Sequence, residues 1–103
     1  MPAHFLWLVL IYPVLEEIVF RGLIQDYCNR KFKGSRCGVI SYANFSTSIV
    51  FASAHLFHHS LLWSILAFFP SLLFGFARER YNNLTAPIVL HVFYNLGYYS
   101  LYR

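Results

Sequence analysis

Side chains suited to acid–base chemistry lie inside the apolar segments of this chain. Five such residues occupy three different segments: Glu16, Glu17, His55, His91 and Asn95. A carboxylate at the centre of a membrane helix costs about 2.5 to 3.5 kcal/mol on insertion scales. Residues kept at that cost indicate a function, and we expect them to face the interior of a bundle or a water-filled cavity.

The two glutamates are not equivalent, because Arg21 follows Glu17 by four residues. Side chains four apart on a helix are neighbours, whereas Glu16 is offset from Arg21 by roughly 140° around the helix axis. Glu17 is therefore the expected partner of Arg21. Both glutamates could simply neutralise the arginine, but one suffices for that, which leaves Glu16 as the candidate for chemistry.

The histidines and the asparagine are weaker signals when taken singly. His91 and Asn95 lie four residues apart and share one helix face, but such a pair is more often a hydrogen-bonded contact between helices. The case for a site rests on the combination, since three segments bring polar groups into an interior with little else polar. His55 is expected nearer the outer face than His91, so the two share a site only if the second helix is tilted or begins later.

The composition indicates that a bilayer is the solvent of this chain of 103 residues. Hydrophobic residues make up 58% and charged residues 12%, against about 25% charged in an ordinary soluble domain, and the mean hydropathy is +0.52. Four apolar segments, each near the roughly 20 residues that cross a membrane, are predicted as helices: 5–24, 39–57, 61–77 and 86–102. The expected fold is one all-α domain over 1–103, a polytopic bundle of about four transmembrane helices.

Two of these segments carry features that modify the prediction. Pro13 and Pro70 lie inside the first and third segments and are expected to kink them. The second segment begins with a polar stretch, so this face is expected to pack inward or the helix to start later: Ser41, Tyr42, Asn44, Ser46, Thr47 and Ser48.

Basic residues concentrate in alternate loops. The first and third loops hold six of them, and the second holds no Lys or Arg: Arg30, Lys31, Lys33, Arg36, Arg78 and Arg80. The positive-inside rule places loops one and three in the cytoplasm and both chain ends outside. The net charge of +4 could also suggest nucleic-acid binding, but the apolar bulk argues against it, and no nucleic-acid partner is expected.

The remaining polar residues are given ordinary roles. Cys28 and Cys37 flank the basic loop and are expected to be reduced thiols if that loop is cytosolic. A metal or disulfide role is the alternative, but no second cysteine pair completes a zinc site. The N-terminus is not expected to be a cleaved signal peptide, because it lacks a basic n-region and a small-residue cleavage site. Four loop or near-loop residues are interpreted as exposed surface groups: His58, His59, Asp26 and Glu79.

Three motifs together resemble those of the CPBP family, which includes CAAX prenyl proteases and bacteriocin-immunity-like membrane proteins. The stretch EEIVFRG at 16–22 resembles the EExxxR motif of the family, and FASAH at 51–55 resembles its FxxxH motif. The stretch APIVLHVFYN at 86–95 resembles its HxxxN motif, and LFGF at 73–76 also resembles the family. Any single motif is weak, but order and spacing agree over about 13–99.

The resemblance implies an intramembrane glutamic endopeptidase that needs no metal cofactor. Glu16 would be the catalytic carboxylate, and His55 would help it to activate water. Two residues would form the oxyanion site, His91 and Asn95, and two would support it, Glu17 and Arg21. Amide hydrolysis needs a base for water and donors for the developing oxyanion, and a partly desolvated glutamate, an imidazole and an amide N–H suit these tasks.

The expected partners are the lipid bilayer and a membrane-anchored protein or peptide with a short C-terminal sorting tail or a CAAX-like tail. The expected location is the bacterial inner membrane. Two alternatives remain: a zinc protease with Glu16, His55 and His91 as ligands, and a non-catalytic immunity or scaffold protein. Because family members usually carry more helices before the first motif, the chain is expected to be a minimal core, a fragment or one half of an assembly.

Overall fold

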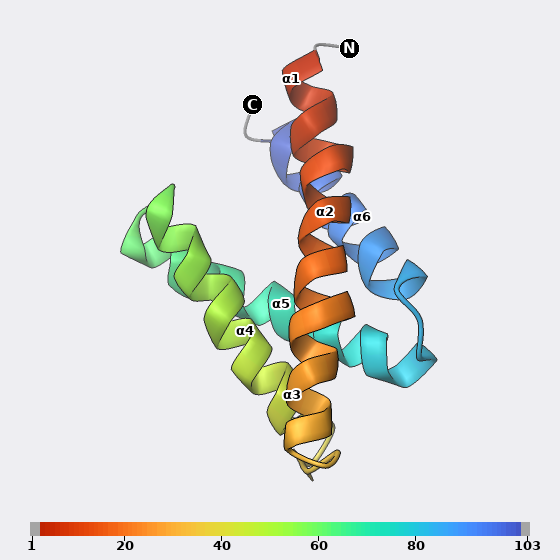
Figure 1. The fold of residues 1–103 in the computed structure, drawn as a ribbon. Coiled ribbons are helices and arrows are strands. Elements are labelled where there is room, and N and C mark those ends of the chain that lie inside the picture. The colour runs from red at the N-terminus through yellow and green to blue at the C-terminus, as the bar shows by residue number, and fades with distance from the viewer. Residues whose placement is uncertain (1–2, 102–103) are drawn as a thin grey trace.

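The computed structural model describes residues 3–101, which form a bundle of helices with one short hairpin (Figure 1). The first long helix is continuous but changes its hydrogen-bonding register twice: α1 Ala3–Leu6, the π-helical η1 Trp7–Ile11, α2 Tyr12–Val19, the π-helical η2 Phe20–Ile24 and α3 Gln25–Lys31. The rest of the chain contains β1 Arg36–Cys37, β2 Ile40–Ser41, α4 Tyr42–Ala54, the 3₁₀ turn η3 His55–Phe57, α5 Leu61–Tyr81 and α6 Thr85–Leu101.

The four predicted apolar segments correspond to four helical regions, and their bounds differ from the prediction. The first helix continues past 24 to Lys31, and α4 begins at Tyr42 and not at 39. The predicted end of the fourth segment, residue 102, lies outside the described residues. Within 3–101, two helices are long and apolar enough to cross a membrane, Ala3–Lys31 and Leu61–Tyr81. The helices α4 and α6, with 13 and 17 residues, are shorter than a typical span of roughly 20.

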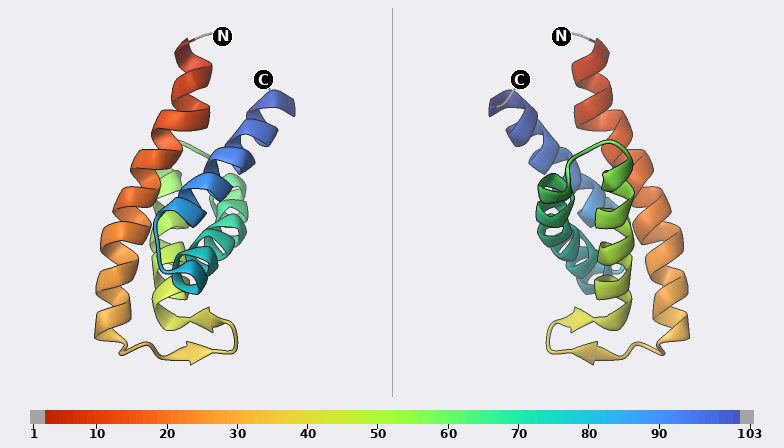
Figure 2. Two further views of the ribbon diagram at one scale, coloured as in Figure 1. Left: turned by 90° about the vertical axis from the view of Figure 1, so that its right-hand side faces the viewer. Right: turned by 90° about the vertical axis from the view of Figure 1, so that its left-hand side faces the viewer.

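The hairpin between α3 and α4 departs from the all-α expectation. Its strands are antiparallel, with Arg36 paired to Ser41 and Cys37 paired to Ile40. The turn uses Gly38 at a φ of 66°, in the left-handed region that glycine tolerates without strain. The hairpin lies at the end of the bundle opposite both chain ends (Figure 2), so the predicted loop is partly ordered as a ribbon.

The packing order of the helices places four helical regions around one interior. The first helix contacts α4 through α3 and contacts α6 through α2, while α5 packs against both α4 and α6. The chain ends and the α4–α5 connection lie toward one end of the molecule, and the hairpin and the α5–α6 connection toward the other (Figures 1 and 2). This alternation agrees with the order of loops expected from the sequence.

Polar side chains fill the interior and large apolar side chains cover the outside. The predicted inward packing of the polar start of α4 is confirmed, because four residues there are buried: Ser41, Asn44, Thr47 and Ser48. Leu15, Leu23 and Phe69 are instead more than half exposed, at 52%, 64% and 60%. Such a surface is unfavourable in water and matches a hydrocarbon surrounding.

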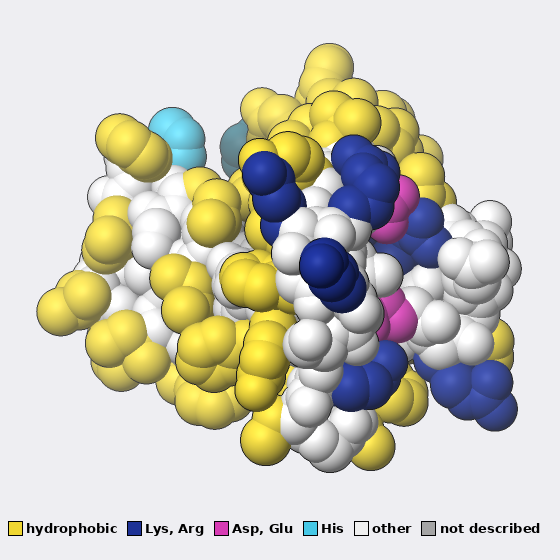
Figure 3. Space-filling model, turned by 60° about the horizontal axis from the view of Figure 1, so that its bottom comes forward, with side chains coloured by type: hydrophobic (Ala, Val, Ile, Leu, Met, Phe, Trp, Pro, Cys, Tyr) yellow, Lys and Arg dark blue, Asp and Glu magenta, His cyan; other side chains and the backbone are white. Residues whose placement is uncertain are grey.

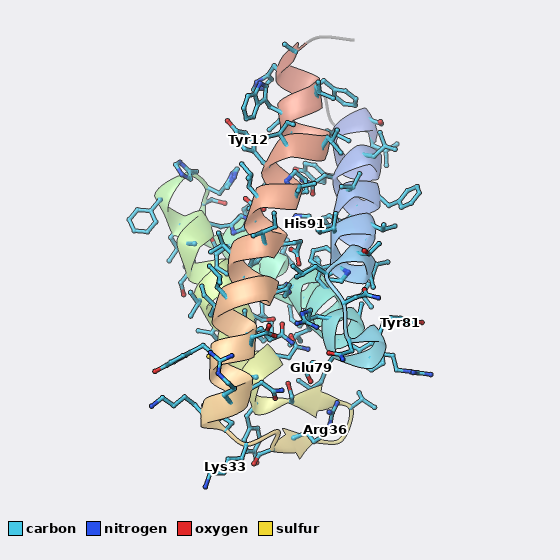
Figure 4. The ribbon with its side chains drawn as sticks, turned by 45° about the vertical axis from the view of Figure 1, so that its right-hand side comes forward. Tyr12, Lys33, Arg36, Glu79, Tyr81 and His91 are labelled. Carbon is cyan, nitrogen blue, oxygen red and sulfur yellow. The ribbon has the colours of Figure 1, made fainter. Side chains whose placement is uncertain are left out.

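Charged side chains gather at the hairpin end (Figure 3), and Glu79 does not fit the predicted surface role. Its Oε2 accepts hydrogen bonds of 2.6 Å from Gln25 Nε2 and from Ser41 Oγ, and its side chain is only 16% exposed. Arg36 Nη1 lies 3.7 Å from Glu79 Oε1, and Figure 4 shows the two side chains beside the hairpin. Glu79 was missed because partners 38 and 54 residues away leave no local pattern.

The other acidic group near this end, Asp26, pairs with Arg78. The guanidinium Nη2 of Arg78 lies 2.9 and 3.0 Å from the two carboxylate oxygens of Asp26, which is 37% exposed. This pair ties α3 to the end of α5. Cys28 and Cys37 are both free.

The crossing of α4 and α5 depends on a glycine. Asn44 Nδ2 donates to Leu72 O at 2.9 Å, and Gln25 Nε2 donates to Gly75 O at 3.0 Å, so two polar side chains lie against the α5 backbone. A Cβ at Gly75 would overlap Asn44 Oδ1 and lie 2.9 Å from Gln25 Oε1.

The substitution Gly75→Ala should therefore destabilise the protein by about 1–3 kcal/mol, because Asn44 must leave its position on α5. Thermal unfolding in detergent micelles measures the effect. Gly97→Ala is the matched control, since nothing lies within 4 Å of a Cβ there, and helix propensity favours alanine by up to ~1 kcal/mol. Equal melting temperatures for the two variants would contradict the assignment.

Candidate active site

One cavity of about 600 Å³ lies among the first helix, the end of α4, α5 and α6. Four of the residues singled out in the sequence line it: Glu16, His55, His91 and Asn95. Aromatic side chains form much of the remaining wall: Tyr12, Phe51, Trp63, Phe74, Tyr94, Tyr98 and Tyr99. Glu17 and Arg21 do not line the cavity and lie behind it, buried in the bundle.

His91 joins the two glutamates of the first helix. Its Nδ1 lies 2.6 Å from Glu17 Oε2, and its Nε2 lies 3.5 Å from Glu16 Oε1. A carboxylate only accepts, so His91 Nδ1 donates to Glu17, and Nε2 faces Glu16. The Glu16 side chain is 38% exposed and lines the cavity.

The predicted pairing of Glu17 with Arg21 is present. Arg21 Nε lies 3.3 Å from Glu17 Oε1, and neither side chain is exposed. The Arg21 guanidinium lies over the rings of Phe51 and Phe74, 5.3 and 5.8 Å from their centroids. Arg21 thus compensates the charge of Glu17, which makes the burial of both side chains tolerable.

Ser71, which the sequence did not single out, holds the guanidinium, and Ser48 contacts Ser71 in turn. Arg21 Nη2 donates to Ser71 O at 2.9 Å and to Ser71 Oγ at 2.7 Å. Ser71 Oγ donates to Ser48 Oγ at 2.8 Å, and Ser48 Oγ donates to Asn44 Oδ1 at 3.3 Å. Small polar residues inside apolar segments were the available signal, but their partners lie on other helices. The polar face of α4 thus supports the glutamate pair through Arg21.

His55 reaches the cavity because α4 begins later than predicted and crosses the first helix obliquely (Figure 1). Its Nδ1 lies 2.8 Å from Phe51 O, and a carbonyl only accepts, so Nδ1 carries the proton. In the neutral ring Nε2 is then an acceptor. The Phe51 ring packs against both His55 and His91, with centroid distances of 4.7 and 5.9 Å.

Asn95 presents its amide between the cavity and the first helix. Its Nδ2 donates to Leu8 O at 3.0 Å, and both residues line the cavity. This bond uses one of the two amide N–H groups, and the other remains for a second acceptor.

The loop histidines contribute more than the sequence suggested. His58 and His59 are exposed, as predicted, but both also line the cavity. His59 stacks on Trp63, with ring centroids 4.5 Å apart and planes inclined by 9°, and on His55 at 5.7 Å. Desolvation lowers the pKa of His59, and the neighbouring His55 and His58 lower it further.

The geometry does not provide a set of ligands for the zinc alternative. Residues 3–101 contain no group of three or more His, Cys, Asp or Glu side chains that could hold a metal ion. Both nitrogens of His91 face carboxylates, and Nδ1 of His55 is engaged by Phe51 O.

Removing the arginine alone should damage the fold more than removing the pair. Arg21→Gln leaves the buried Glu17 carboxylate without compensation and should cost about 3–5 kcal/mol. The double variant Glu17→Gln with Arg21→Gln should recover part of that loss, as measured by thermal unfolding in detergent. Arg80→Gln, an exposed cation, is the control. A double variant less stable than Arg21→Gln would refute the coupling.

Comparison with known proteins places these residues in a family context. The model of the family described as "Type II CAAX prenyl endopeptidase Rce1-like" matches residues 1–97. An uncharacterized 24.3 kDa protein of Escherichia coli is 29% identical over 87 residues, which is 84% of this chain and 38% of that protein. The membrane-embedded CAAX protease MroQ of Staphylococcus aureus (strain USA300) is 29% identical over 94 residues, 91% of this chain and 37% of its own length.

The chain thus spans less than two fifths of the length of these two curated relatives. No solved structure matches it. The family match covers most of the chain, including all three motifs, and it confirms the resemblance found in the sequence. The chain belongs to the Rce1-like type II CAAX prenyl endopeptidase family.

Proposed function

We propose that this chain is the core of an intramembrane glutamic endopeptidase, a hydrolase that cleaves a peptide bond in a membrane-associated protein. The observation that carries the proposal is the convergence of four side chains from three segments on one cavity: Glu16, His55, His91 and Asn95. Membership of a family of CAAX proteases supports the reaction class.

The environments of the two glutamates assign their roles. Glu16 is 38% exposed in the cavity and can reach a water molecule, whereas Glu17 is fully buried and held by Arg21 and His91. Glu16 is therefore the general base, and Glu17 orients the imidazole of His91. Neighbouring carboxylates in different surroundings commonly divide catalytic work in this way.

The proposed reaction is a direct attack of water on the scissile carbonyl. Glu16 takes a proton from a water that also donates a hydrogen bond to His55 Nε2, and the hydroxide forms a bond to the carbonyl carbon. The oxyanion receives hydrogen bonds from the free N–H of Asn95 and from protonated His91 Nε2. Glu16 then returns the proton to the leaving nitrogen as the C–N bond breaks.

The surroundings of the site support a membrane location. Two helices are long and apolar enough to span, large apolar side chains cover the outside, and the relative MroQ is named as membrane-embedded. We propose that α4 with η3, and α6, complete a four-helix membrane bundle in a bacterial inner membrane. The basic residues at the hairpin end then face the cytoplasm.

The cavity favours an uncharged peptide substrate. Apart from Glu16, Asn95 and the histidines, its wall is apolar or aromatic, with Leu8, Leu66 and Pro70 among the apolar members. A membrane-anchored chain, with a C-terminal sorting tail or a CAAX-like tail, presents such a segment. The name of MroQ as a CAAX protease supports the choice of tails.

The decisive variant is Glu16→Gln. It should reduce peptide cleavage by about 10²- to 10⁴-fold with an unchanged melting temperature, because it removes the base and keeps the shape. Mass spectrometry of C-terminal peptides compares bacterial membranes that contain the wild type or the variant, and the tails found are then assayed with the purified chain in liposomes. Asp26→Asn, at the hairpin end, is the control and should cleave like the wild type.

Three outcomes would count against the proposal. Cleavage that survives Glu16→Gln would remove Glu16 as the base. A chelator that abolishes cleavage, with recovery on adding Zn²⁺, would favour the zinc mechanism. If the membranes yield no tail that depends on the wild-type chain, a scaffold role is preferred.

A further inference from the structure

The first helix contains a backbone carbonyl that has no donor in its own helix. In the π-helical segment η1, the N–H of Tyr12 donates to Trp7 O, so it is not available to Leu8 O, its α-helical acceptor. The donor that the π register would supply to Leu8 O is residue 13. That residue is Pro13, which has no N–H.

Asn95 supplies the missing donor from another helix. Its Nδ2 donates to Leu8 O at 3.0 Å across the contact between η1 and α6. Because a carbonyl only accepts, the amide must turn its NH₂ and not its oxygen toward the first helix. A carbonyl left without a donor in an apolar surrounding is costly, so this bond defines the rotamer of Asn95.

We propose that Pro13 is a positioning residue. Because Pro13 leaves Leu8 O without a helical donor, this carbonyl accepts from Asn95 and locks its amide at the cavity. The lock aims the second N–H of Asn95 into the cavity. It also joins α6 to the first helix, one turn from His91, and so maintains the approach of His91 to Glu16. The catalytic part of this inference rests on the proposed function, in which that N–H serves the oxyanion.

A second proline provides a control that distinguishes the proposed lock from the general effect of a proline in a helix. Pro70 also lies inside a helix, α5, and also deprives its own helix of one hydrogen bond. It lies on another helix from Leu8, so its replacement restores a backbone N–H that does not serve Leu8 O. Pro70→Ala is therefore the same chemical change as Pro13→Ala, made at a position that does not serve Leu8 O.

The first test is a double-mutant cycle on stability, which needs no substrate. Asn95→Ala should lower the melting temperature by about 4–8 °C in the wild-type background, because Leu8 O loses its donor. In the Pro13→Ala background, residue 13 can donate to Leu8 O, and the loss should fall to less than half. In the Pro70→Ala background the full loss should remain.

Asn95→Asp in the same backgrounds guards against poor folding of the alanine variants. Its carboxylate keeps the shape of the amide and cannot donate, so it should show the same dependence on residue 13. Losses that are equal in the Pro13→Ala and Pro70→Ala backgrounds, for either substitution, would overturn the lock.

The second test separates positioning from mere structure. Pro13→Ala alone should retain or raise the melting temperature. It should nevertheless lower kcat for a tail peptide by about tenfold, with KM within about twofold. The reason is that residue 13 then serves Leu8 O, so this carbonyl no longer fixes the Asn95 amide. An unchanged kcat would refute the positioning role. A wild-type chain that cleaves nothing would refute the proposed function instead, and the stability cycle would still decide the lock.

Discussion

The buried ion pair between Glu17 and Arg21 is the interaction on which the rest of the site depends. Neither side chain is exposed, and Arg21 Nε lies 3.3 Å from Glu17 Oε1. An unpaired charge at this depth would be too costly to keep, so each group requires the other. The pair leaves Glu17 Oε2 free to hold His91 at 2.6 Å, and His91 in turn approaches Glu16. The ion pair of Glu17 and Arg21, which lies behind the cavity, thus sets the orientation of His91 toward Glu16.

Glu16 and Glu17 are adjacent residues of the same type, but their surroundings differ. Glu16 and Glu17 point to different sides of one helix, one into a cavity and one into packed protein. Burial with a cation makes Glu17 a fixed acceptor of hydrogen bonds, while Glu16 stays partly exposed to the cavity. Ser71 on α5 binds the guanidinium directly, and Ser48 on α4 supports Ser71 through a hydrogen bond.

The organisation of the bundle fits a bilayer as the surrounding medium. Hydrocarbon offers no hydrogen bonds, so polar groups are driven inward and must be satisfied there. Asn95 donating to Leu8 O, and Gln25 and Ser41 donating to Glu79, are examples in which a side chain supplies what the solvent does not. The same constraint concentrates the remaining charges at the hairpin end, where water or lipid headgroups can reach them.

Local spacing by itself determined the helical segments, the family and the pairing of Glu17 with Arg21, because these depend on residues within one or two turns. The tertiary structure decided what long separations control. His91 meets Glu17 across 74 residues and Asn95 meets Leu8 across 87, and no periodicity predicts which partner a polar group finds at that distance. The π-helical register, the burial of Glu79 and the convergence of the cavity residues belong to the same class. They arise from the crossing of helices, which is set by packing of the whole chain and not by the pattern of any one segment.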